Sequence, residues 1–429
     1  MSEVLPGYQQ TEFGTFPDDW QSVTLASTAS RSQNAIVGGP FGSDLVSADY
    51  TINGVPVIRG QNMGSKFIDG EFVFVSPSKA KSLTANCASA ADLIFTQRGT
   101  LGQVSIVPNC AFQRYVVSQS QMKLTVDKAR FDPEYFYYYF SSPTGQRQVM
   151  ESAIQTGVPH TNLGILRQYR LPVPTTLGEQ KAIAQALSDI DDLIASLDAL
   201  ISKKRDIKHG AMQQLLTGKR RLPGFSGEWV NGQVGDLASC LRGVSYNGDA
   251  DLRKDQAANT RMLLRSNNIY EGKLVFKDVQ NVVSERVKIV QILDKGDILI
   301  CMANGSKVLV GKSALIDRSY PNLTFGAFMG CLRPLLKDDG LFLHFLFQTE
   351  RYRAQIADVL SGSSINNLSP KQIEGLSFVF PDFDERVAIA ECLQSFELDE
   401  AAHQMTRDKL ISMRQGMMQQ LLTGRIRLV

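Results

Sequence analysis

Apolar residues recur in alternating steps of four and three along residues 179–218, a segment that contains no proline. They are Ile183, Leu187, Ile190, Ile194, Leu197 and Ile201. This heptad spacing predicts a long helix with a single apolar stripe. Two prolines shortly before the segment mark its approach, and Gly218 with three basic residues after it suits its C-terminal end.

A second apolar stripe lies at equivalent positions in the second half of the chain. It consists of Ile389, Leu393, Phe396, Leu410, Met417 and Leu421. Glu400, His403 and Arg407 interrupt it, which leaves positions that are partly wet or open to a partner. Each helix would be roughly 60 Å long at about 1.5 Å per residue, too long for one compact domain. A bundle core is the alternative. Because there are two copies, we expect an antiparallel coiled coil between two globular parts.

The segments that precede each stripe mix strand and helix signals, so the fold class is α+β. β-rich runs in the first half fall at residues 54–60, 70–77, 92–99, 103–108 and 120–126. A helix should follow, with Asp132 as N-cap and Pro133 in its first turn. Its aromatic run, 136–140, could be imagined as a base-stacking platform. A helix points side chains around its whole circumference, so we assign most of these rings to the core.

The two halves repeat each other at an offset of 206 residues, or nearly so. Only two tryptophans are present, and each opens one half. Five matches in one order predict a duplicated domain pair with approximate two-fold symmetry, because the period is far too long for a solenoid. The matching pairs are 211–222 with 417–428, 57–62 with 263–268, 179–187 with 385–393, 132–140 with 338–346, and, at 205, Asp92 with Asp297.

The repeat also predicts where the chain ends lie. The first copy of the shared phrase continues as "RLPGF", whereas the last stops at "RLV", and "LPGY" stands near the N-terminus. We therefore expect the termini to lie close together and the halves to close into a pseudo-ring. The expected domains are a globular part at 1–175, a helix and spacer at 176–222, a second globular part at 223–380 and a second spacer at 381–429.

Composition limits the classes of protein that the chain could be. Hydrophobic residues make up 43% and charged residues 21%, with a formal net charge of +2, ordinary values for a globular protein. Any nucleic-acid surface must therefore be local or shared with another subunit. The six cysteines are scattered without a CxxC pair, which argues against a zinc site and suits a reducing cytoplasm. No secretory signal or run long enough to span a membrane is apparent, so we expect a cytoplasmic protein.

The sequence offers no persuasive catalytic constellation. "GSKVLVGKS" at 305–313 looks like a phosphate-binding loop, but it has five residues where that loop needs four, and we expect a strand pair near a turn there. "GGPFGSD" at 38–44 lacks the GxGxxG spacing. There is no HExxH, no GxSxG and no paired-acid motif. The Asn/Asp-Pro-Pro-aromatic tetrapeptide and the glycine-rich cofactor loop of amino-methyltransferases are also missing. We expect a non-catalytic chain that binds no metal and no cofactor of its own.

Polar side chains suited to base edges remain, in predicted loops. Arginine can read guanine, and asparagine or glutamine can read adenine, in the major groove. Loop asparagines and serines also cap helices and shape turns, and "NL" at 162–163 and 367–368 favours a shared cap. The candidates are Arg59, Gln61, Asn62, Gln97, Arg98, His160, Thr161 and Asn162 in the first half, and Arg265, Asn267, Asn268, Asn304, Ser306, Lys307, Ser363, Ser364, Asn366 and Asn367 in the second.

The layout resembles the specificity subunit of type I restriction–modification systems, over essentially the whole chain. In the second half "LRGVSYNGDADL" replaces the glycine-rich phrase, so the two globular parts should recognise different sequences. The resemblance is carried by "GGPFGSDL", "GVPVIRGQNM", "ADLIFTQRGTLGQVSIV", "LPVPTTLGEQKAIAQAL" and "MQQLLTGKRRLPGF", with "GDILICMANGSKVLVGKSALI" and "LLTGRIRL" as second-half counterparts.

The resemblance implies two target recognition domains that bind a bipartite, asymmetric double-stranded DNA sequence, with the helices setting the spacer. It implies two methyltransferase subunits, which use S-adenosylmethionine to methylate adenine at N6, and two ATP-using restriction/translocase subunits as partners. Two alternatives from other classes stay open. One is a duplicated protein-binding adaptor with a coiled-coil spacer, and the other is an enzyme with a nucleotide site at 305–313.

Overall fold

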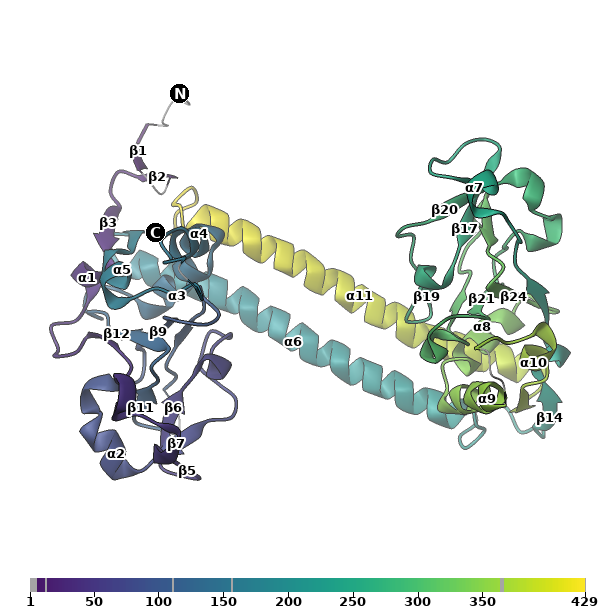
Figure 1. The fold of residues 1–429 in the computed structure, drawn as a ribbon, viewed down its shortest axis with the longest axis horizontal. Helices are drawn as coiled ribbons and strands as arrows, with labels where there is room; N and C mark the ends of the chain where they lie inside the picture. The colour runs from purple at the N-terminus through teal and green to yellow at the C-terminus, as the bar shows by residue number, and fades with distance from the viewer. Residues whose placement is uncertain (1–5, 12–13, 110–111, 156, 363–365, 429) are drawn as a thin grey trace. The chain divides into compact units, whose positions relative to one another are not determined.

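The computed structural model describes residues 6–11, 14–109, 112–155, 157–362 and 366–428. The chain forms two compact units, and the boundary between them falls inside both long helices. Unit 1 comprises Met1–Asp198 with Met405–Val429, and unit 2 comprises Ala199–Gln404. Each unit therefore contains one globular part and one end of each long helix (Figure 1).

The two predicted long helices are confirmed as α6 (Leu177–Leu215) and α11 (Phe383–Leu421), each of 39 residues. In unit 1 the start of α6 packs on the end of α11, where Leu187 and Leu421 share one buried core. In unit 2 the end of α6 packs on the start of α11, where Leu215 and Leu393 are buried together. Start meets end in both units, so the helices pair antiparallel.

Two of the polar residues that interrupt the stripe of α11, Glu400 and Arg407, form ion pairs with α6, whereas His403 contacts Asp399 of its own helix. All three stay partly exposed, as expected. In unit 2, Arg205 donates to Glu400 at 2.6 Å, and Lys208 lies 3.5 Å from the same carboxylate. Burial acts against ionisation, but the hydrogen bond from Arg205 leads the effects that hold the pKa of Glu400 below its usual value. In unit 1, Arg407 pairs with Asp198.

The globular part of unit 1 contains two main sheets and two short antiparallel ribbons, β1–β2 and β3–β13. The first sheet is antiparallel, in the order β10-β9-β12-β4, and the second runs β5-β7-β6-β11-β8 with β6 and β11 parallel. The strands are β1 (Tyr8–Thr11), β2 (Gly14–Pro17), β3 (Gln21–Thr24), β4 (Ile36–Gly38), β5 (Tyr50–Thr51), β6 (Val55–Ile58), β7 (Val73–Val75), β8 (Cys87–Ala88), β9 (Leu93–Thr96), β10 (Val104–Ile106), β11 (Tyr115–Val117), β12 (Gln121–Leu124) and β13 (Arg170–Val173).

Unit 2 repeats the strand order of the first sheet and of the first four strands of the second. Its antiparallel sheet has the order β22-β21-β24-β15, its second sheet has the order β16-β20-β17-β23 with β17 and β23 parallel, and β14–β25 and β18–β19 are ribbons. The strands are β14 (Val230–Gln233), β15 (Ala238–Arg242), β16 (Leu252–Arg253), β17 (Thr260–Leu264), β18 (Ile269–Tyr270), β19 (Lys273–Leu274), β20 (Gln280–Val283), β21 (Ile298–Cys301), β22 (Ser313–Leu315), β23 (Leu323–Phe325), β24 (Met329–Pro334) and β25 (Ser377–Phe380).

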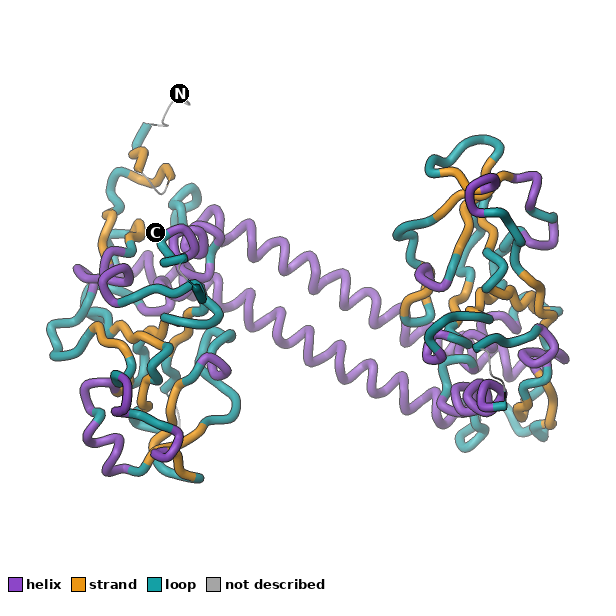
Figure 2. The backbone as a smooth tube through the Cα atoms, in the orientation of Figure 1, coloured by secondary structure: helices purple, strands orange, loops and turns teal. Residues whose placement is uncertain are grey.

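Three short helices also correspond between the units, and loops make up much of each globular part (Figure 2). The aromatic helix is confirmed as α3 (Pro133–Ser141), with Asp132 accepting from Glu134 N and Tyr135 N, and its rings are buried in the core. The remaining α-helices are α1 (Leu25–Thr28), α2 (Pro77–Ser82), α4 (Pro143–Glu151) and α5 (Leu163–Gln168) in unit 1, and α7 (Gly248–Asp251), α8 (Asp339–Leu346), α9 (Glu350–Ser361) and α10 (Pro370–Glu374) in unit 2. Helices α3, α4 and α5 correspond to α8, α9 and α10.

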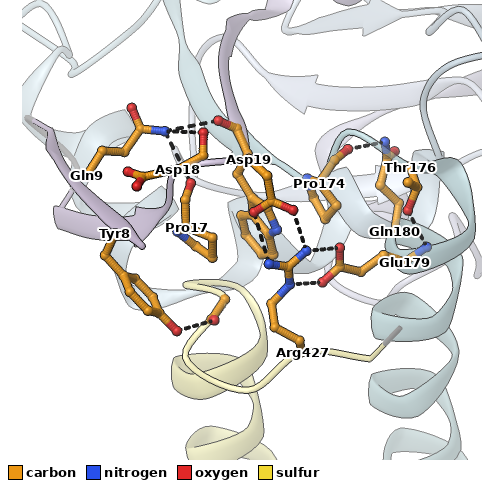
Figure 3. A network of polar contacts seen from close by, with 12 residues as sticks. Tyr8, Gln9, Pro17, Asp18, Asp19, Pro174, Thr176, Glu179, Gln180 and Arg427 are labelled. Atoms are coloured by element: carbon orange, nitrogen blue, oxygen red, sulfur yellow. Dashed lines mark hydrogen bonds and ion pairs between the residues drawn. The ribbon is translucent and has the colours of Figure 1, made fainter. Parts of the chain in front are cut away.

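The expectation that the chain ends meet is confirmed within unit 1 (Figure 3). The Tyr8 hydroxyl donates to Gly424 O at 3.0 Å, and Arg427 bonds both Asp19 and Glu179. We call Arg427, Glu179 and Trp20 the unit 1 clasp, because the Arg427 guanidinium also lies 5.8 Å from the Trp20 ring.

Unit 2 contains the same arrangement without a chain break. Arg221 bonds Glu385 with two nitrogens and lies 5.7 Å from the Trp229 ring, whose Nε1 donates to Glu385. We call Arg221, Glu385 and Trp229 the unit 2 clasp. The recurring "LLTG" phrase thus builds one loop that joins a helix end to the start of a globular part, once through continuous chain and once across the termini.

Candidate nucleic-acid interface

A tight turn with one arginine and one asparagine recurs in both units. In unit 1, Arg59 leads into the 3-10 turn Gly60–Asn62, and Asn62 Oδ1 accepts from Arg59 N at 3.1 Å. Asn62 Nδ2 donates to the carbonyls of Asp69 and Glu71 at 3.0 and 2.9 Å. We call this the arginine turn. Its asparagine is fully buried, so it holds the loop together and has no surface with which to read a base.

The arginine turn of unit 2 has the same geometry 206 residues later. Asn268 Oδ1 accepts from Arg265 N at 2.9 Å, and its Nδ2 donates to the carbonyls of Val275 and Lys277 at 3.0 and 2.9 Å. Asn268 is also fully buried. Asn62 and Asn268, both predicted base contacts, are therefore structural, and the neighbouring positions are the ones exposed to a ligand.

The two arginines share an unusual electrostatic position. Arg59 Nε and Arg265 Nε are both buried, and neither finds a hydrogen-bond partner among the described residues. The exposed amides beside them, Gln61 and Asn267, each donate back to the carbonyl of a following residue, at 2.9 and 3.5 Å. A buried, unsatisfied guanidinium nitrogen is costly unless a ligand satisfies it. Both arginines are thus suited to an acceptor-rich ligand.

Unit 2 places several predicted residues around one recess with a volume of ≈ 810 Å³. The Asn304 amide donates to Ser266 Oγ at 3.1 Å, and the Asn366 amide donates to Gly305 O at 3.2 Å. The side chains that line it include Tyr246, Arg265, Asn267, Asn304, Phe328 and Asn366.

A second, shallower groove of ≈ 380 Å³ meets the recess at Arg265. It is lined also by Arg253 and Lys254, both exposed. Arg265 Nη2 donates to Asp278 O at 3.1 Å, which fixes one edge of its guanidinium. Amides and aromatics on one side of an arginine and basic side chains on the other suit a ligand that carries both bases and phosphates.

Beside each arginine turn a glycine packs against a loop so closely that no side chain fits. A Cβ on Gly39 would lie 1.9 Å from Ser118 O, and a Cβ on Gly243 would lie 1.9 Å from Gly326 O. Ser118 N in turn bonds Ile58 O, and Gly326 N bonds Leu264 O, the residues before the two arginines. The glycine-rich phrase of the first half therefore has a counterpart at Gly243, which sequence comparison of the halves missed.

The other first-half candidates lie next to this turn, but their second-half equivalents differ from those expected. Gln97 N and Arg98 N both donate to Ser120 O, and the backbones of Arg98 and His160 form an isolated antiparallel β-bridge. In unit 2 the same pattern belongs to Met302, Ala303, Phe328 and Asn367. Gln97 and Arg98 thus correspond to Met302 and Ala303, and not to Asn304, Ser306 and Lys307.

The predicted shared cap is right for one half and displaced in the other. Asn162 caps α5, where its side chain accepts from Ile165 N at 2.9 Å. In unit 2 the cap of α10 is Ser369, two residues beyond Asn367. Thr161, also a candidate, is buried against the Tyr169 hydroxyl and has little surface for a ligand.

The remaining candidates are placed as follows. Ser306 and Lys307 are exposed at the 3-10 turn Lys307–Leu309, and Ser363 and Ser364 lie outside the described residues. The 305–313 segment is a loop, this turn and the start of β22, so it is one strand after a turn where we expected a strand pair, and it lacks the helix that follows a phosphate-binding loop. Within the described ranges no group of three His, Cys, Asp or Glu side chains could hold a metal.

Comparison with known proteins agrees with the duplicated architecture. A family model described as "Type I restriction modification DNA specificity domain" matches residues 52–203. The EcoKI specificity subunit of Escherichia coli K12 is 35% identical over 173 residues, 39% of this chain and 36% of that relative. The putative MjaX specificity subunit of Methanocaldococcus jannaschii is 21% identical over 441 residues, 98% of this chain and 96% of the relative. The chain is thus similar to specificity subunits of type I restriction–modification systems.

The chain spans only about a third of the length of the EcoKI relative that it matches. The S subunit of a type I system from M. genitalium has a similar fold, with a TM-score of 0.58 at 16% identity, covering 94% of this chain and 96% of that one. Among the described helices, none combines the length and apolar character needed to cross a bilayer.

Proposed function

We propose that the chain is the non-catalytic DNA sequence-specificity subunit of a type I restriction–modification complex, binding a bipartite, asymmetric double-stranded target. The observation that carries the proposal is the arginine turn, repeated with unlike surroundings. Arg59 has the exposed amide of Gln61 beside it, whereas Arg265 lines a recess with asparagines and a phenylalanine. Arginine suits guanine, and the two amides suit adenine. A constant frame with differing side chains fits two different half-sites.

The proposal includes two methyltransferase subunits, which use S-adenosylmethionine to methylate adenine at N6, and two ATP-using restriction/translocase subunits. This chain would hold neither cofactor. The formal charge of +2 supports shared DNA binding, since phosphate contacts dominate affinity and partners would supply many of them. We place the complex in the cytoplasm, where buried thiols such as Cys301, whose pKa burial raises to about 11, stay reduced.

Exposed apolar side chains on the long helices support the partner part of the proposal. Leu193, Leu200 and Ile207 of α6 are exposed at steps of seven, so they lie on one face of that helix. Leu398 and Met405 of α11 are exposed at the same spacing. Such a stripe suits packing by a partner's helix. The same stripe fits the alternative function, a duplicated adaptor that binds only proteins.

Single-molecule methylome sequencing tests the DNA function directly. A host that expresses the chain with its neighbouring methyltransferase subunit should carry one bipartite motif methylated on adenine. Arg265→Ala should relax or abolish one half of the motif and leave the other half unchanged. Arg318→Ala is the matched control, because Arg318 stacks on Tyr320 and does not line the recess. Absence of methylation in the wild-type strain, or an equal effect of both variants, contradicts the proposal.

A pull-down separates the adaptor alternative from the specificity subunit. If the chain recovers a methyltransferase and binds duplex DNA only together with it, the specificity function holds. If it recovers other proteins and the complexes ignore DNA, the adaptor function holds. Replacing Lys312 with alanine should do little in either case, since 305–313 lacks the form of a nucleotide site.

A further inference from the structure

An exposed phenylalanine stands beside the arginine turn in each unit, but the two come from different segments. In unit 2, Phe328 is 70% exposed, follows the loop on which Gly243 packs, and lines the recess with Arg265. In unit 1 the position that corresponds to Phe328 is Ser120, and the phenylalanine is Phe41 of the glycine-rich loop, 90% exposed.

The loop that carries Phe41 is tied to the same place. Gly39 packs against Ser118 O, and the Gln119 side chain donates to the carbonyls of Gly42 and Leu45 at 2.6 and 3.2 Å. The two loops that meet beside the arginine turn are thus the same in both units. In unit 1 the loop with the packed glycine supplies the phenylalanine, whereas in unit 2 the loop on which that glycine packs supplies it. Because the supplying segments differ, alignment of the two halves cannot pair these residues.

Exposure of a large apolar ring amid polar, basic side chains points to a ligand that covers it. Phe328 shares its recess with arginine and amide side chains, and the Gln119 amide holds the loop that carries Phe41. Such groups suit base edges in the major groove. The apolar group that duplex DNA presents in that groove is the 5-methyl of thymine. A ring wedged between base pairs is the other arrangement, but unstacking a step costs about as much as burial of one ring gains. Contact with a methyl group needs no unstacking.

We propose that Phe41 and Phe328 are specificity-determining residues, each of which contacts the 5-methyl group of a thymine, one thymine in each half-site. This rests on the proposed DNA function and deepens it by naming the reading residue and the chemical group read. Each arginine turn and its neighbouring phenylalanine then read adjacent features of the same half-site, the arginine through acceptors and the ring through the methyl group.

The test measures binding of the chain, copurified with its methyltransferase subunit, to DNA duplexes. These duplexes contain the bipartite motif that methylome sequencing identifies. Deoxyuridine replaces one thymine at a time and removes only the methyl group. One substitution in each half-site should weaken wild-type binding by about fourfold, the transfer free energy of a methyl group expressed as a ratio of dissociation constants. Phe328→Ala should lose this sensitivity in one half-site and keep it in the other, and Phe41→Ala should show the reverse.

Leu335→Ala is the matched control, because Leu335 is an exposed apolar residue just beyond the far end of β24 from Phe328. It should keep both sensitivities. Unchanged sensitivity in both phenylalanine variants overturns the inference, as does a wild-type complex that tolerates every deoxyuridine. A phenylalanine-dependent rise in 2-aminopurine fluorescence would establish the wedge instead. If the wild type methylates a bipartite motif but no deoxyuridine substitution weakens binding, only this inference is wrong. If no bipartite motif is methylated, the proposed function is wrong as well.

Discussion

Replacing Arg427 with methionine should destabilise unit 1 by opening the unit 1 clasp. Arg427 donates to Asp19 at 3.0 and 2.8 Å and to Glu179 at 2.8 Å, with a further bond from Nε to Glu179. Hydrogen bonding to Glu179 leads the effects that raise the pKa of Arg427. Methionine keeps an apolar stem beside Trp20 and removes the charge and all of these bonds.

The burial of Glu179 sets the magnitude. Its side chain is 2% exposed, so removing the arginine leaves an unpaired buried carboxylate. Breaking a buried pair costs about 3–5 kcal/mol. Arg427 is 28% exposed, which favours the lower end, about 3 kcal/mol. Asp19 is 58% exposed and adds little. The double variant Arg427→Met with Glu179→Gln should recover most of the loss, because a neutral amide is cheaper to bury than a carboxylate.

The two tryptophans make the assay selective. Trp20 belongs to the unit 1 clasp and Trp229 to the unit 2 clasp. In a Trp229→Phe background, the urea midpoint followed by fluorescence reports unit 1, and in a Trp20→Phe background it reports unit 2. Arg427→Met should lower the first midpoint and spare the second, and Arg221→Met is the matched control with the opposite pattern. The reasoning is wrong if Arg427→Met shifts neither midpoint or both equally, or if the double variant is no more stable than the single one.

Three further predictions follow from unit 2. Asn268→Asp replaces two donated hydrogen bonds with charge repulsion and should lower the free energy of unfolding in urea by about 2–4 kcal/mol. It should also abolish methylation through one half-site. Gly243→Ala places a Cβ against Gly326 O and should cost about 1–3 kcal/mol in thermal unfolding, whereas Gly248→Ala, with open space around it, should be close to neutral. Burial lowers the pKa of His344 to about 4, below the unfolded value of about 6.5. As the pH is lowered, the unfolded chain therefore takes up the proton first, so the stability of the folded chain decreases from pH 6.5 down to pH 4. This side chain should account for about 2 kcal/mol of loss between pH 7 and 5, and His344→Gln should unfold with a flatter pH dependence; an equally steep profile would contradict this.

Periodicity and the internal repeat are the features from which the fold could be predicted. The heptad spacing around Leu187 and Leu393 identified both long helices, because an apolar stripe of that length and period is typical of a long helix and of little else. The "RLPGF" continuation correctly placed the C-terminus near residue 8, since a duplicated loop must close the same way twice. Asp132 before Pro133 marked the start of α3, because a cap is a local feature that sequence alone specifies.

The candidate site was predicted less completely, because it depends on register between the halves. The offset is 206 at the arginine turn but 204 between Gly39 and Gly243 and 207 between the helix caps Asn162 and Ser369. Alignment of the halves by residue identity does not detect such small insertions. It therefore paired Asn162 with Asn367 and not with Ser369. Composition also could not distinguish a buried asparagine that bonds carbonyls from an exposed one, since that depends on the strand folded against it.

The arginine turn explains physically how two copies of one domain can come to recognise different sequences. Its hydrogen bonds run from the buried asparagine to backbone carbonyls, so they do not depend on which side chains stand on the surface. Gln61 and Asn267, or Ser120 and Phe328, can therefore differ between the halves without loosening the frame that orients the arginine. Stability rests on the buried half of the loop and reading rests on the exposed half. Exchange of Ser120 and Phe328 between the units should thus alter recognition while leaving both urea midpoints in place, and a large loss of stability would show that the two roles are coupled.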